Sequence, residues 1–402
     1  MRDPGLRISV RLTHGRVTAS LRLPRAKRIS ERHSSRGRRR IMENFEPDAR
    51  EAAIGRRDFI KLGAGAGVMM ALDSRGAAAQ GARAEPVSID LHTHWVPEAY
   101  DKALAQLKRP TPASNNPLEF DLDKRRKWMD EHGVQMHVLT LSGGMPWQWV
   151  PPDVGAHLAQ IINDAAAEAH NAFPDRFVAG IELSIHDPQL ALKELNRVAG
   201  KPGLRAVHLP NSIQGRDYLF EPAYAPLLAR CEELGYPLLF HPLDGEANYY
   251  VGKQRLADPL SVSAGLSNSL GFTFETATTA AKFIATGTLD KYPRLEIVLP
   301  HSGGVFPYIA GRGDRYMMNS KFKLQRPVRE YVRRFHYDAL TFYPETLRFL
   351  IGLVGSDRVV IGTDNFALMD VESPNGLVEQ LNLPPADRER ILKGNAARLL
   401  RL

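Results

Sequence analysis

Short apolar runs alternate with longer amphipathic runs along the chain from residue 88 onward. The short runs are rich in Val, Ile, Leu and Phe, as buried strands are, and the longer runs have apolar residues at helical spacing. Eight strands are therefore expected, at 88–95, 134–141, 177–183, 204–209, 237–241, 295–300, 335–339 and 359–362. Helices are expected between them, at 121–132, 152–173, 188–199, 221–234, 273–286, 305–316 and 344–354.

This strict alternation of strand and helix predicts a parallel sheet whose strands are joined by helical crossovers. Eight such units predict that residues 85–402 form one catalytic domain, an α/β protein with the (β/α)8 TIM-barrel fold. An open, doubly wound sheet is the alternative. It is disfavoured because no glycine-rich phosphate loop follows the first strand.

The positive charge is concentrated in the first part of the chain. The formal net charge is +8, but residues 1–84 hold 19 of the 53 basic residues and only 8 of the 45 acidic ones. The remaining residues therefore have a slight excess of acid. We expect no nucleic-acid surface on the barrel, because the basic charge belongs to the leader.

The leader contains the features of an export signal. The pair Arg56-Arg57 precedes an apolar run at 62–72, and the small-residue motif Ala-Arg-Ala ends at Ala84. Residues 42–84 thus resemble a twin-arginine signal peptide, which implies a periplasmic or secreted protein. The apolar run is too short for a membrane anchor. Residues 1–41 have no apolar period, so they are expected to be disordered or to precede the true start at Met42.

Residues that bind metals or transfer protons recur at the predicted strand ends. His92 and His94 are two apart on the first strand, so they are expected to share a face. This pair alone is weak evidence, because two exposed histidines would give the same pattern. His241, His301 and Asp364 end or follow the fifth, sixth and eighth strands. Since the carboxyl ends of barrel strands meet at one face, the five residues together predict a metal site.

The order of these motifs resembles that of a known family. HTH on the first strand, HP after the fifth, HSGG after the sixth and GTD after the eighth are arranged as in the amidohydrolase superfamily. The sequence is most similar to the branch of aminocarboxymuconate-semialdehyde decarboxylase and the resorcylate-type decarboxylases. The pieces that carry this resemblance run from DLHTHWVPEAY through LDKYPRLEIVLPHSGGVFPYIAGRGDR and YDAL to GNAARLL.

The resemblance implies a role for each of the five residues. His92, His94, His241 and Asp364 would bind one divalent metal ion, most simply zinc, with manganese as the alternative. His301 would be the catalytic acid/base residue, and Asp364 is the other candidate for delivering the proton. The end of the fourth strand lacks the lysine that bridges two metals in binuclear relatives, so a single metal is expected.

Four further residues are candidates for substrate contact. Trp95 and Phe366 lie at strand ends and either line an aromatic pocket or fill the core. His208, on the fourth strand, is either a substrate group or a buried structural histidine. Arg312 either binds a substrate carboxylate or pairs with Asp314.

The resemblance implies a metal-dependent, non-oxidative carboxy-lyase whose partner is a small aromatic or dienoic carboxylic acid. The decarboxylases usually have Tyr-Pro after GTD, where this chain has Asn365-Phe366, so a metal-dependent hydrolase of a lactone, ester or amide remains the alternative. A ligand-binding barrel without activity is disfavoured because all five site residues are present. No nucleic-acid partner and no membrane anchor are expected, and a homodimer is left open.

Overall fold

The computed structural model describes residues 8–13, 16–21, 87–108, 116–141, 150–213, 215–243, 256, 259–318, 324–366, 371 and 373–402. The chain divides into two units, Met1–Ala77 and Ala78–Leu402. The described part of the first unit is an antiparallel pair of strands, β1 (Ile8–Thr13) and β2 (Arg16–Leu21). This pair falls in the segment expected to be disordered, and its apolar residues alternate along each strand. The proposed signal at 42–84 lies outside the described residues.

The second unit is built on eight parallel strands that are hydrogen-bonded in chain order, as the sequence predicted. Bridges between Asp90 and Ile361 and between Thr93 and Asn365 join the last strand region to the first. These bridges close the sheet into a (β/α)8 TIM barrel. The strands are β3 (Ser88–Trp95), β4 (Val134–Leu141), β5 (Phe177–Ile181), β6 (Leu204–Pro210), β7 (Leu238–His241), β8 (Ile297–Leu299), β9 (His336–Asp338) and β10 (Val359–Val360).

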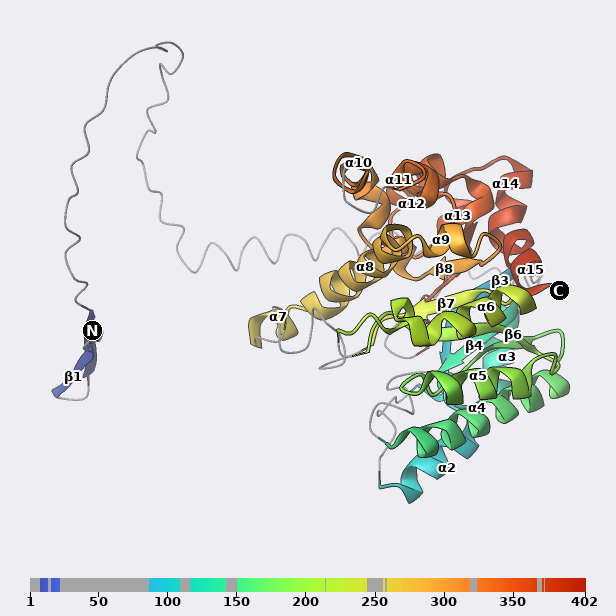
Figure 1. Ribbon diagram of the computed structural model, residues 1–402, viewed down its shortest axis with the longest axis horizontal. Helices are drawn as coiled ribbons and strands as arrows, with labels where there is room; N and C mark the ends of the chain where they lie inside the picture. Colours follow the sequence, from blue (N-terminus) through green and yellow to red (C-terminus); the bar gives the residue numbers. More distant parts are fainter. Residues whose placement is uncertain are drawn as a thin grey trace, which may run out of the picture. The chain divides into compact units, whose positions relative to one another are not determined.

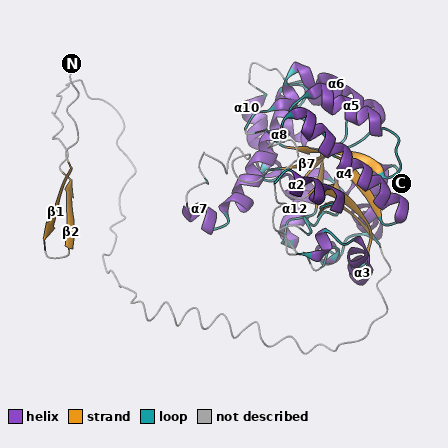
Figure 2. Cartoon of the chain, turned by 90° about the horizontal axis from the view of Figure 1, so that it is seen from below, coloured by secondary structure: helices purple, strands orange, loops and turns teal. Residues whose placement is uncertain are grey.

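Helices surround the strands of this unit, as both ribbon views show (Figures 1 and 2). Among the described residues, no helix has both the length and the apolar character needed to cross a membrane. The helices are α2 (Glu98–Gln106), α3 (Leu122–His132), α4 (Pro152–Ala172), α5 (Pro188–Val198), α6 (Ala225–Leu234), α7 (Pro259–Ser263), α8 (Phe272–Ala285), α9 (Thr288–Lys291), α10 (Phe306–Met317), α11 (Val328–Val332), α12 (Pro344–Val354), α13 (Gly376–Glu379), α14 (Pro385–Glu389) and α15 (Asn395–Leu400).

Two separate apolar clusters hold the barrel together. The larger cluster includes side chains from the helices and from the strands. The smaller one lies inside the barrel and is made by alternate strand residues, with Leu399 and Leu400 of α15 packed against them. Alternate residues of a strand point to opposite faces, so each strand contributes to both clusters. The inner cluster contains Ile89, Leu91, Met136, Val138, Val178, Ala206, Leu239, Val298 and Val360.

β3 departs from regular alternation at Leu91 and His92. The pairing of β3 with β4 shifts register between Asp90 and Thr93. Leu91 belongs to the inner cluster, yet its neighbour His92 lines the same interior cavity as Leu91. A bulge of this kind turns a strand so that successive side chains reach one region. It allows an apolar residue and a metal-type ligand to follow each other on the inside of the barrel.

Candidate metal centre

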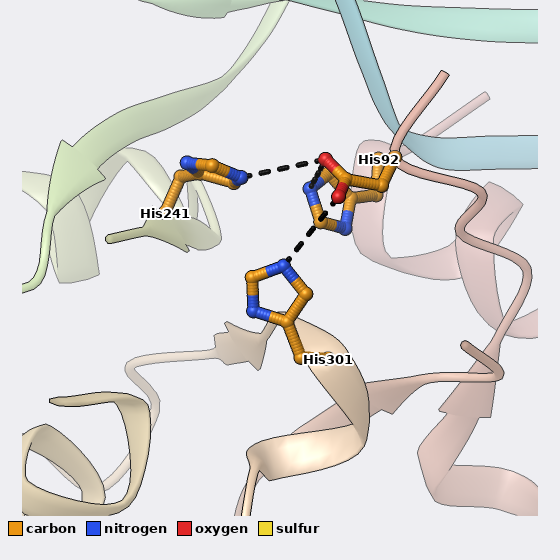
Figure 3. Close-up of side chains that lie close together, drawn as sticks. His92, His241 and His301 are labelled. Carbon is orange, nitrogen blue, oxygen red and sulfur yellow. Dashed lines mark ion pairs between the residues drawn. The ribbon is translucent and has the colours of Figure 1, made fainter. Parts of the chain in front are cut away.

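Five predicted residues converge at the carboxyl ends of four strands. His92 and His94 are on β3, and His241 is the last residue of β7. His301 begins the short 3-10 turn after β8, and Asp364 follows β10. In Figure 3 the rings of His92, His241 and His301 point toward a common centre, where dashed lines mark their ion pairs with the carboxylate of Asp364.

One carboxylate oxygen of Asp364 is the meeting point of three imidazoles. Oδ1 of Asp364 lies 2.8 Å from Nε2 of His94, 3.1 Å from Nε2 of His92 and 3.5 Å from Nε2 of His241. His301 approaches the other oxygen, with 3.7 Å between its Nε2 and Oδ2. Three imidazole nitrogens and one carboxylate oxygen form a donor set typical of a catalytic divalent metal.

The ring orientation of three histidines leaves Nε2 facing this centre. Nδ1 of His92 is 2.8 Å from Oδ2 of Asp338, and Nδ1 of His241 is 2.7 Å from the carbonyl oxygen of Pro242. Nδ1 of His94 is 3.3 Å from the carbonyl oxygen of Leu141. Each acceptor requires a proton on Nδ1, so a neutral ring offers a lone pair at Nε2, as metal-binding histidines do.

His301 is held differently. Its Nδ1 is buried and forms no hydrogen bond within the described residues. A compact group of ligand-type atoms, all within 4.8 Å of one another, comprises His92, His241, His301 and Asp364. His94 is outside that group although its Nε2 is the one nearest to Asp364. His92, His94 and His241 face one carboxylate oxygen of Asp364, and His301 faces the other.

The electrostatics of the site suit a cation. Burial alone would lower the pKa of His92, but the carboxylates of Asp364 and Asp338 raise it to about 10. Burial would raise the pKa of Asp364, but His92 and the neighbouring histidines hold it well below its usual range. Burial keeps the pKa of His241 well below the ordinary value. The buried Nε2 atoms of His92 and His241 form no hydrogen bond within the described chain beyond their approach to Asp364, so the residues present fit a bound metal ion.

Asp338 is part of the site, although the sequence did not single it out. Its carboxylate accepts the hydrogen bond from His92 and also the backbone N–H groups of His301, at 2.9 Å, and Ser302, at 2.6 Å. It therefore orients the ring of His92 and the turn that begins at His301. The signal that could have identified it is its position at the end of the seventh strand, in the piece YDAL.

Arg125 is a second residue that sequence reasoning missed. This side chain on α3 is fully buried, donates from Nη2 to the carbonyl oxygen of His94, and donates from Nε to that of Leu118 at 2.7 Å. Burial lowers its pKa to about 9, against the opposing influence of Glu119 and Asp90. Arg125 thus fixes the backbone at His94 from the helix side of the barrel.

Of the four residues proposed for substrate contact, the structure places only His208 beside the metal centre, where it lines a cavity with His92 and His241. Trp95 is buried in the larger cluster. Phe366 is buried against Trp128, with ring centroids 4.8 Å apart. Arg312 is exposed on α10, 4.8 Å above the ring of Tyr316, and the carboxylate of Asp314 accepts a backbone N–H from Arg329 at 3.3 Å.

A TIM barrel with three histidines and one aspartate at the carboxyl ends of its strands defines a class, the metal-dependent enzymes that bind a single divalent ion. The Amidohydrolase family matches residues 89–402, and the chain belongs to that family. This confirms the superfamily that the motif order indicated.

The chain is also similar to individual relatives and to solved structures. The chain is 28% identical over 289 residues to 2-amino-3-carboxymuconate-6-semialdehyde decarboxylase of Dictyostelium discoideum, covering 70% of this chain and 77% of the relative. It is 29% identical over 296 residues to gamma-resorcylate decarboxylase of a Rhizobium species, covering 70% and 87%. A crystal structure of dihydroxybenzoic acid decarboxylase from a Polaromonas species, with bound manganese and 2-nitroresorcinol, is 26% identical with a TM-score of 0.63, covering 78% and 97%.

Proposed function

We propose that this protein is a metal-dependent, non-oxidative decarboxylase of a small aromatic or dienoic carboxylic acid. Relatives that span most of the barrel are named as decarboxylases of such acids. The observation that carries the proposal is the difference among the four histidines. Three present Nε2 to one oxygen of Asp364, and His301 faces the other oxygen, which supports a separate role for it as the proton donor.

The chemistry requires an electron sink and a proton donor. His92, His94, His241 and Asp364 would hold a divalent ion, which would supply the positive charge that serves as the electron sink. The bond between the carboxyl carbon and its neighbour breaks, its electron pair stays on that neighbouring carbon, and carbon dioxide leaves. His301 then donates a proton to this carbon from Nε2, the nitrogen that faces Asp364.

The remaining features of the proposal concern the ion, the location and the assembly. We assign zinc as the ion because the donors are nitrogen-rich, and manganese, which a relative binds, is the alternative. We place the protein in the periplasm or outside the cell, on the strength of Arg56-Arg57 and the apolar run after them.

A homodimer is supported by exposed aromatic side chains on α10 and α12, where Tyr308 stacks on Phe349 with ring centroids 4.9 Å apart.

Product analysis tests the reaction. The protein, loaded with zinc or manganese, is incubated with a panel of hydroxybenzoates, dienoic acids, lactones and amides. We expect carbon dioxide and a decarboxylated product from at least one acid, and no product after the metal is removed by a chelator. Hydrolysis of a lactone, ester or amide, with no carbon dioxide from any acid, would replace the decarboxylase with the hydrolase.

A further inference from the structure

A small cavity of about 20 Å³ lies between the metal centre and the inner apolar cluster. Leu91, Leu239 and Val298 of the inner cluster line one part of it, and His92 and His241 line another. A volume above roughly 10–15 Å³ holds one water molecule, provided that at least two polar groups face it. The cavity is therefore large enough for one water, and its polar lining decides whether one binds.

His208 lines this cavity and has a ring nitrogen without a hydrogen-bond partner among the described residues. Its Nδ1 lies 2.7 Å from Oε1 of Glu182, and the same oxygen accepts the backbone N–H of Leu141 at 3.0 Å. Because a carboxylate accepts, the proton of a neutral His208 is on Nδ1, and Nε2 has a lone pair. That Nε2 is buried, with 3% of the residue exposed, and has no partner among the described residues.

Thr140 is the second polar group available to a water. Its hydroxyl donates to the carbonyl oxygen of Thr93 at 2.8 Å, which leaves lone pairs free to accept. Asp338 also lines the cavity, but its two oxygens already accept four hydrogen bonds, from His92, His301, Ser302 and Leu340.

Gly180 provides the room between the two side chains. A Cβ at this position would lie 3.0 Å from Cβ of His208 and 3.2 Å from Cγ2 of Thr140. A larger residue would therefore push against both of the groups that face the cavity.

We propose that this cavity binds one structural water, which donates hydrogen bonds to Nε2 of His208 and to Oγ1 of Thr140. The carbonyl oxygen that Thr140 holds belongs to Thr93, the residue between the ligands His92 and His94. Glu182, His208, the water and Thr140 form one connected support beneath this pair of ligands. His208 and Thr140 are positioning residues for the metal, and their role does not depend on which reaction the metal serves.

A pair of substitutions at Thr140 and a high-resolution crystal structure test the proposal. Thr140→Val keeps the shape of the side chain but removes its hydroxyl, and Thr140→Ser keeps the hydroxyl. In the wild type we expect a density peak within hydrogen-bond distance of both His208 Nε2 and Thr140 Oγ1. Zinc affinity, measured by competition with a chelator, should fall about 10-fold in Thr140→Val and stay near wild type in Thr140→Ser.

Three results would overturn the proposal. The first is an empty cavity in the wild type, and the second is wild-type zinc affinity in Thr140→Val. The third is equal loss of affinity in both variants, which would mean that packing and not the hydroxyl matters. The melting temperature of the metal-free proteins shows whether Thr140→Val folds. If it does not, Glu182→Gln, which retains an acceptor for His208 Nδ1, should keep the water and zinc affinity, and loss of either contradicts the proposal.

Discussion

His301 differs from the other histidines of the centre because its Nδ1 forms no hydrogen bond within the described residues. The rings of His92, His94 and His241 are each fixed through Nδ1. The backbone N–H of His301 donates to Asp338, while its ring Nδ1 has no hydrogen-bond partner in the described part of the chain. A ligand must keep one geometry, whereas a proton donor must change its protonation state. The proposed roles of metal ligand and proton donor thus fall to histidines whose ring nitrogens make different hydrogen bonds.

This separation predicts the behaviour of His301→Asn. The variant should retain its metal and its melting temperature, while kcat falls about 100-fold or more, because a general acid typically contributes that much. Metal analysis, thermal unfolding and steady-state kinetics on the same preparation provide the comparison. If activity per folded molecule stays near wild type, His301 only stabilises its turn. If the metal is lost, His301 is a ligand.

The sequence allowed the five converging residues to be predicted because they end strands, and strand ends meet at one face of a barrel. It did not reveal Asp338, since the partner that defines its role is 246 positions away on β3. The sequence also did not indicate whether Trp95 and Phe366 fill the core or line a pocket. Both end up buried in side-chain packing, and an aromatic residue at a strand end satisfies either role.

At the scale of elements, β3 looks like a regularly alternating strand in the sequence, but its pairing with β4 is irregular. Alternation predicted that His92 and His94 share a face. The register shift between Asp90 and Thr93, which places Leu91 and His92 on one cavity, has no signature in the residue types themselves. Such a bulge depends on the neighbouring strands, so it appears only in the folded barrel.

β4 contains a histidine, His137, whose burial lowers the stability of the folded chain at low pH. His137 is fully buried, and neither of its ring nitrogens has a hydrogen-bond partner in the described part of the chain. Burial, with Arg125 and Arg176 nearby, holds its pKa well below the ordinary value of 6.5. Below pH 6.5, His137 therefore binds a proton in the unfolded chain but stays neutral in the folded chain. The free energy of unfolding falls as the pH falls through that value.

His137→Leu should remove this acid sensitivity. We expect the free energy of unfolding to be unchanged or higher at pH 7.5, because an unsatisfied polar group is replaced by an apolar one. Below pH 6.5 the variant should gain on the wild type by up to about 1.4 kcal/mol per pH unit. Urea unfolding of both proteins at pH 7.5 and 5.5 measures this difference. His157→Gln, an exposed change on α4, is the control, and equal pH dependence in wild type and His137→Leu would refute the assignment.

At the scale of the whole molecule, the strand–helix alternation was sufficient to predict the barrel, and the structure confirms it. The alternation did not indicate which residues close the barrel. Thr363 donates to Oδ2 of Asp90 at 2.6 Å across 273 positions of sequence, and this bond joins the region after β10 to β3. Closure depends on such distant pairs, which no local pattern contains.

The leader gives a prediction that is independent of the barrel. With Arg56→Lys and Arg57→Lys together, the protein should remain in the cytoplasm, folded and able to bind metal, because the twin-arginine route reads the arginine pair. Fractionation of cells that express the two forms measures this. Arg50→Lys, outside the pair, should be exported as the wild type is. Normal export of the double variant would exclude the twin-arginine route.

The central claim is that His92, His94, His241 and Asp364 hold one divalent ion in each chain. Elemental analysis of the purified protein after growth with added zinc and manganese tests it most directly. We predict about one ion per folded wild-type chain and loss of most of it in His241→Ala, which leaves three protein ligands, while the exposed control His157→Ala keeps its ion. Folded wild-type protein with almost no metal, or His241→Ala with a full complement, would contradict this account.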